Sequence, residues 1–285
     1  MYSFITILSG VVLAMMVAVN GELSAQYGAF GSSLIVQVVG TIVAFLAIIM
    51  KRERFVLTPK VSKGYYLTGI VTASITVFQN IAFHHISMTS IIALGLVGQT
   101  LISLIIDQFG LFGMKKTSPS KSSIVCLLFA IVGICVMADG TIGNSMMSII
   151  LSLAAGVAIV LSRIFNAKIA ERTTMLQGSF ISYVLGLPAV ALIAWFMKEI
   201  PAGIHVSLAN SWMYLGGIFG VMIVFMCNLT ALHVSAFKLT MFIFAGQVLT
   251  GIVLDLILQS FVMDASFWGG IIISIGILLS KILDR

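Results

Sequence analysis

Long uninterrupted apolar runs, separated by short polar stretches, dominate the hydrophobic pattern of this chain. The runs approach the roughly 20 residues that a helix needs to cross a bilayer, and they lack the ten-residue alternation of barrel strands. Because backbone polar groups in lipid must be paired within the protein, continuous runs of this length predict helices. The pattern predicts ten transmembrane helices, with approximate limits 3–27, 31–50, 64–85, 89–110, 122–139, 146–168, 175–197, 211–232, 237–259 and 265–283.

The composition supports a membrane environment. Hydrophobic residues make up 60% of the chain and charged residues only 8%, against about 25% charged residues in soluble domains. So apolar a chain cannot cover itself with a polar surface in water, which excludes a soluble enzyme or a large soluble domain. The lipid bilayer is therefore its expected partner.

The basic residues predict an orientation. Of the 15 lysines and arginines, all but Lys198 fall on one side of a ten-helix arrangement. By the positive-inside rule, both termini and the even-numbered connections are expected in the cytoplasm, which predicts a multi-pass protein of the cytoplasmic (inner) membrane. The net charge of +6 is thus a signal of topology, and no nucleic-acid partner is expected.

The two halves of the chain resemble each other. A shift of 146 residues aligns Asn20 with Asn166, Ser33 with Ser179 and Gly40 with Gly186. A shift of 148 residues aligns Asn80 with Asn228, Gln99 with Gln247 and Asp107 with Asp255. We therefore expect two five-helix repeats, 1–139 and 146–285, within a single membrane domain. Five is an odd number, so the second repeat enters the membrane from the opposite side, as in the inverted repeats of alternating-access carriers.

These residues also carry a family resemblance. The segment from Ala18 to Gly40, its counterpart from Asn166 to Gly186, and Gly98-Gln99 followed by the stretch from Ile106 to Gly110 resemble the YdcZ-type branch of the drug/metabolite transporter (DMT) superfamily. The resemblance implies an all-α integral membrane protein with the DMT/EamA-like fold, a ten-helix carrier with a central cavity lined mainly by helices 1, 3, 4, 6, 8 and 9. Glu22 departs from it, since relatives typically have a neutral or basic residue there.

Polar groups within the spans are the candidate functional residues, because placing them in lipid costs free energy. The candidate substrate-binding residues are Asn20, Glu22, Asn80, Gln99, Asn166, Asn228 and Gln247. The candidates for proton coupling or gating are Glu22, Asp107, Asp255 and His84. For each, the structural alternative is a hydrogen bond between helices, and for Glu22 also a position at the lipid headgroups.

These observations predict a secondary-active transporter that moves a small organic solute by alternating access, coupled to protons. A cationic or amphipathic solute is the first expectation, from Glu22 and the aromatic residues, and a small neutral metabolite is the alternative. A passive channel or an intramembrane enzyme are the competing functions, but no nucleophile, metal-ligand or Walker A motif is present. No cofactor or metal is expected, and we expect a monomer or a homodimer.

Overall fold

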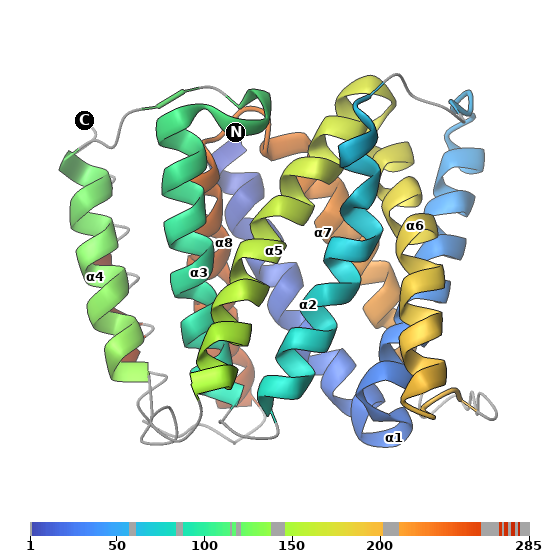
Figure 1. Ribbon diagram of the computed structural model, residues 1–285, viewed down its shortest axis with the longest axis horizontal. Helices are drawn as coiled ribbons and strands as arrows, with labels where there is room; N and C mark the ends of the chain where they lie inside the picture. The colour runs from blue at the N-terminus through green and yellow to red at the C-terminus, as the bar shows by residue number, and fades with distance from the viewer. Residues whose placement is uncertain are drawn as a thin grey trace. The chain divides into compact units, whose positions relative to one another are not determined.

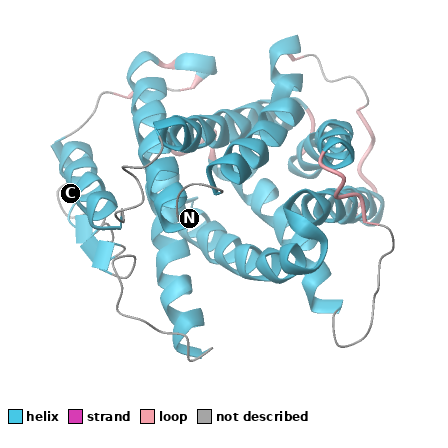
Figure 2. Ribbon diagram, turned by 60° about the horizontal axis from the view of Figure 1, so that its bottom comes forward, coloured by secondary structure: helices cyan, strands magenta, loops and turns pink. Residues whose placement is uncertain are grey.

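A computed structural model gives the fold of the chain. It describes residues 2–56, 61–83, 88–114, 116–117, 121–137, 146–201 and 211–257, together with 268–269, 271–272, 275–276 and 279. All regular structure in these residues is helical, and Figure 2 accordingly draws helices and loops without a strand in the described part of the chain.

Figure 1 shows the helices, and their bounds lie close to those of the predicted spans. They are α1 (Tyr2–Met50), α2 (Thr68–Phe83), α3 (Met88–Phe109), α4 (Lys121–Met137), α5 (Met146–Arg172), α6 (Met175–Phe196), α7 (Gly216–Thr230) and α8 (Ala236–Ile257). Short 3-10 turns precede α2 (η1, Lys63–Leu67) and α7 (η4, Ser211–Leu215), and a third follows α3 (η2, Leu111–Gly113). Most of the predicted span 265–283 lies outside the described residues.

Helix α1 contains two predicted spans. Its 49 residues would measure about 73 Å as one straight helix, more than twice the hydrocarbon core of a bilayer. The helical geometry breaks at Gly28, whose φ of 75° and ψ of 169° lie in a region that is essentially restricted to glycine. Residues 2–27 and 29–50 therefore form two helical segments, at the positions predicted for the first two spans.

Four described helices are long and apolar enough to cross a membrane. They are Tyr2–Met50, Met146–Arg172, Met175–Phe196 and the continuous stretch Ser211–Thr230. Exposed large apolar side chains such as Phe4, Ile49 and Leu192 are common on these helices, as expected where lipid is the solvent.

The chain divides into two compact units, and each takes residues from both sequence halves. Unit 1 holds 1–11, 77–160 and 232–285, and unit 2 holds 12–76 and 161–231. In unit 1, α3 packs against α4 and α8, and Leu96 of α3 forms a buried core with Phe237, Met241, Phe244 and Ala245 of α8. In unit 2, α6 packs against α7, and Ala44, Tyr183 and Val221 form a buried cluster.

Candidate functional site

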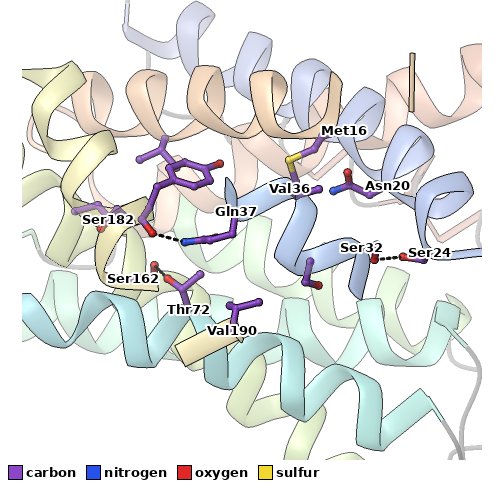
Figure 3. A pocket seen from close by; sticks show the side chains of 14 residues that line it. Met16, Asn20, Ser24, Ser32, Val36, Gln37, Thr72, Ser162, Ser182 and Val190 are labelled. Atoms are coloured by element: carbon purple, nitrogen blue, oxygen red, sulfur yellow. Dashed lines mark hydrogen bonds between the residues drawn. The ribbon is translucent and has the colours of Figure 1, made fainter. Parts of the chain in front are cut away.

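Unit 2 contains a cavity of about 280 Å³ (Figure 3). Residues from α1, α2, α5, α6 and α7 contribute to its walls. The lining residues are Met16, Asn20, Ser24, Ser32, Ser33, Val36, Gln37, Thr72, Ser162, Asn166, Ser182, Tyr183, Val190 and Val224. Its volume lies just below the range of about 300–1,000 Å³ that is usual for ligand sites, so it suits only a small solute.

The lining is polar and uncharged. Ten of these fourteen side chains carry a hydroxyl or an amide, and the other four are apolar. No Asp, Glu, Lys, Arg or His occurs among the described residues that line it. Such a surface can form hydrogen bonds to a solute, but it offers no counter-ion.

Hydrogen bonds between helices hold the polar walls in place. The hydroxyls of Thr72 and Ser162 lie 2.9 Å apart and join α2 to α5. The hydroxyls of Ser24 and Ser32 lie 2.8 Å apart across the break in α1. Both pairs are drawn in Figure 3. They fix the side chains that surround the space without filling it.

Positions 146 residues apart meet in the lining. Gln37 Nε2 donates to the carbonyl oxygen of Tyr183 at 2.8 Å. Around this bond, the ring of Tyr183 lies against Gly40 and the amide of Gln37 lies against Gly186. Three more lining pairs have the same separation, namely Met16 and Ser162, Asn20 and Asn166, and Val36 and Ser182.

Two glutamates close the ends of the helix pair formed by the second segment of α1 and by α6. Glu199, just beyond α6, accepts hydrogen bonds at Oε2 from the backbone nitrogens of Phe30 at 2.7 Å and Gly31 at 3.4 Å. Glu53, just beyond α1, accepts a hydrogen bond from the hydroxyl of Thr174, the N-cap of α6. The end of each helix thus contacts the start of the other, so the two helices run antiparallel. We call these the Glu199 contact and the Glu53 contact.

The structure brings two of the predicted substrate residues together. Asn20 and Asn166 both line the cavity, and Asn166 is buried with its Oδ1 accepting the Thr68 hydroxyl at 2.6 Å. Asn228 is fully buried and does not line it. Its Nδ2 donates to the carbonyl oxygen of Met175 at 3.2 Å and to Ser179 Oγ at 3.4 Å, which ties α7 to α6.

Glu22 is exposed on α1 and is not among the lining residues. It lies between Asn20 and Ser24 in sequence, but its side chain leaves the helix on another face. The carboxylate that motivated a cationic solute is therefore not part of this cavity's wall.

The remaining described candidates belong to unit 1. Asp107 is buried at the end of α3, and its two carboxylate oxygens accept from the backbone nitrogens of Ala236 at 2.8 Å and Phe237 at 2.9 Å. It thereby caps the N-terminus of α8, a stabilising arrangement for a negative charge. Gln99 and Gln247 are half-buried on α3 and α8.

Three predicted residues cannot be placed in a site. His84 lies outside the described residues. Asn80 lies in α2 and Asp255 in α8, but their side chains are outside the described part of the structure. Their roles stay predictions.

Sequence reasoning missed Gln37, Ser162 and Ser182 in the cavity and the two glutamates at the helix ends. A signal for some of them was available. Gln37 and Tyr183, and likewise Glu53 and Glu199, are separated by the same 146 residues that align Asn20 with Asn166. The repeat could thus have identified polar residues that pair with each other, even where the residue types differ.

Comparison with known proteins agrees with this architecture. No curated protein matches the chain. Among solved structures, one crystal structure of a protein superimposes with a TM-score of 0.71, covering 99% of this chain and 96% of its own, at 16% sequence identity. At that identity the likeness shows a shared fold alone.

A family model matches nearly the whole chain, in two segments, residues 1–136 and 147–279. The family is described as "Putative inner membrane exporter, YdcZ". The two matched segments correspond to the two similar halves of the sequence. The chain therefore belongs to the YdcZ branch of the DMT superfamily, in its two-repeat form, and is a membrane protein of a transporter family.

Proposed function

We propose that this protein is a secondary-active carrier that moves a small, uncharged polar organic solute across the cytoplasmic membrane. The observation that carries the proposal is the cavity of unit 2, which is polar, uncharged and lined by four pairs of repeat-related positions. Carriers built from repeats bind their substrate at the repeat interface near the middle of the membrane.

An inverted arrangement of the two repeats is part of the proposal. The second segment of α1 and α6 are equivalent under the 146-residue shift, and their end contacts require them to run antiparallel. A two-fold axis that relates antiparallel helices is perpendicular to them, so for membrane-spanning helices it lies in the membrane plane. This geometry supports inverted repeats over parallel ones.

Alternating access would use the Glu199 and Glu53 contacts as gates. Each ties one end of the antiparallel pair, and the cavity lies against the same two helices. Breaking one contact while the other holds would separate the helices at that end only. Since Lys51, Arg52 and Arg54 flank Glu53, the positive-inside rule assigns the Glu53 contact to the cytoplasmic side.

The solute in this proposal is neutral, in place of the cation that the sequence favoured. Binding a cation in a site with low dielectric constant needs a compensating charge, and the described lining supplies none. Among the candidate acids, Asp107 is already engaged with two backbone N–H groups. We assign proton coupling to Glu22, whose exposed carboxylate can exchange a proton.

Transport by purified full-length protein in proteoliposomes tests the carrier function. We expect saturable, competable counterflow of members of a panel of labelled uncharged polar solutes. The variant V36W fills the cavity and should abolish counterflow, whereas L46W introduces a tryptophan at an exposed position of the same helix and should preserve it. Non-saturable flux insensitive to competitors would indicate a channel and refute the carrier.

Proton coupling has a separate readout. The variant E22Q should lose accumulation driven by a pH gradient but keep counterflow, because counterflow needs no net proton movement. Retention of pH-driven accumulation in E22Q would remove Glu22 from the mechanism and leave the carrier function standing.

A further inference from the structure

Among the four lining pairs that are 146 residues apart, Asn20 and Asn166 have the same side chain. Both carry an amide group, which can form hydrogen bonds to a solute. Their oxygen atoms are both turned to the protein. Asn166 Oδ1 accepts the hydroxyl proton of Thr68 at 2.6 Å. Asn20 Oδ1 is sealed from solvent against Gly216, where any Cβ would collide with it.

The nitrogen atoms of the two amides remain for a ligand. Neither Nδ2 makes a hydrogen bond with the part of the chain that the structure describes, and neither is among its sealed, unpartnered polar atoms. In Figure 3 the nitrogen of Asn20 is turned toward Val36, a lining residue. Because each amide nitrogen carries two hydrogens, the two residues present four N–H donors.

The neighbouring groups add hydroxyls, which can donate or accept, and one amide oxygen, which accepts. The hydroxyls of Ser182 and Tyr183 line the same cavity and make no hydrogen bond within the described chain. Gln37 uses its Nε2 on the Tyr183 carbonyl, which leaves its Oε1 as an acceptor. A donor left unpaired when a solute displaces water costs free energy, so the two asparagine amides favour a solute that brings acceptors.

We propose that Asn20 and Asn166 form a two-donor recognition site that selects neutral solutes with hydrogen-bond acceptors at two ends, such as a pair of carbonyl oxygens. This inference rests on the proposed carrier cavity. Each repeat supplies one amide, so one solute bridges the two repeats. Organic cations without acceptors are rejected, because they leave both amides unpaired and find no carboxylate in the described wall.

Binding of two probes to the purified full-length protein tests the site by calorimetric titration. The first is 1,3-dimethyluracil, a neutral ring with two carbonyl acceptors and no donor, and the second is the tetraethylammonium cation. We expect dimethyluracil to bind the wild-type protein more tightly than tetraethylammonium. N20A and N166A should each weaken dimethyluracil binding about 3- to 10-fold, the effect of one neutral hydrogen bond.

Control variants separate recognition from folding. S74A removes a half-buried hydroxyl that bonds only its own helix and does not line the cavity, so it should leave both affinities unchanged. N20D replaces a donor amide by an acceptor of the same shape at a residue without a hydrogen bond in the described chain, so it should weaken dimethyluracil and strengthen tetraethylammonium. N166A also removes the partner of Thr68, so N20A and N20D carry the test if N166A fails to fold.

The two-donor site is refuted if dimethyluracil does not bind at millimolar concentration, if tetraethylammonium binds more tightly, or if both N20A and N166A leave dimethyluracil affinity unchanged. Failure of the carrier proposal is a different result. If dimethyluracil binds and the substitutions N20A and N166A weaken its binding, but no counterflow occurs, the site is supported and transport is refuted. Saturable counterflow that neither N20A nor N166A changes would refute the site alone.

Discussion

The two ends of the antiparallel pair formed by α1 and α6 are closed by glutamates at repeat-related positions, yet in different ways. At one end, Glu199 accepts directly from the backbone nitrogens of Phe30 and Gly31. At the other end, Glu53 accepts from the hydroxyl of Thr174, whose oxygen in turn accepts from the backbone nitrogen of Gln177 at 3.2 Å. Both arrangements place a carboxylate where the first N–H groups of a helix lack partners.

One residue explains the difference. The position equivalent to Thr174 in the first repeat is Gly28. Glycine has no side chain, and the carboxyl group of Glu199 occupies the space where a Cβ would be. The same location is filled by a hydroxyl in one repeat and by a carboxylate from the partner helix in the other. Two repeats can thus keep the same contact between elements while different groups form it.

The largest loss of stability is expected from G28A, because a side chain at this position breaks the Glu199 contact. Alanine would be strained at φ 75°, ψ 169°, and its Cβ would displace the Glu199 carboxylate. Together these should lower the free energy of unfolding by about 3 kcal/mol, measured by thermal or denaturant unfolding in micelles. G21A is the matched control, because nothing surrounds that position of α1, and it should not destabilise the protein. If G28A is as stable as the wild type, then position 28 does not require glycine for the helix break or for the Glu199 contact.

A smaller loss is expected from E199Q, which keeps the shape but removes the charge from two backbone hydrogen bonds. We expect a decrease of about 1–2 kcal/mol in the free energy of unfolding. E171Q removes an exposed glutamate paired with Lys168 and should change it by no more than about 0.5 kcal/mol. If the Glu199 contact is also a gate, a cysteine at Ser33 in the cavity should react faster with an external impermeant maleimide in E199Q, and no faster in E53Q, in a background without native cysteines.

The smallest effect is expected from E53Q, because Thr174 continues to cap α6 through Gln177 without it. We expect a loss of about 0.5–1 kcal/mol for E53Q and about 1 kcal/mol for T174A. If the Glu53 contact acts through the hydroxyl, the E53Q substitution should have no additional effect in the T174A background. Fully additive losses in this double-mutant cycle would show that Glu53 acts elsewhere.

The asparagines of the cavity were predictable and the end contacts were not. Asn20 and Asn166 are polar residues within apolar spans, and they occupy equivalent positions of the two repeats. The free energy of placing a polar group in lipid and the repetition therefore both indicated them. Glu53 and Glu199 lie beyond helix ends, where the sequence alone suggests that a charged side chain is exposed to water. Only their distances to the starts of the opposite helices show that they are engaged.

The directions of side chains explain the other differences between the expectations from the sequence and the structure. Glu22 and Asn20 are two residues apart, which places them about 200° apart around a helix, and the structure puts one in the cavity wall and leaves the other exposed. Asp107 was a candidate for proton coupling or gating and Asn228 for binding a solute, each with a structural hydrogen bond as the alternative. The structure gives each a protein partner, at the N-terminus of α8 and on α6.

By itself the sequence determined that the protein is helical, that lipid is its solvent, and that its halves are copies, because apolar run length, scarcity of charge and repetition are properties of the chain alone. The tertiary structure decided which polar residues share a cavity and which close the helix ends. Those outcomes depend on which faces of helices meet, and several of those faces belong to residues more than a hundred positions apart.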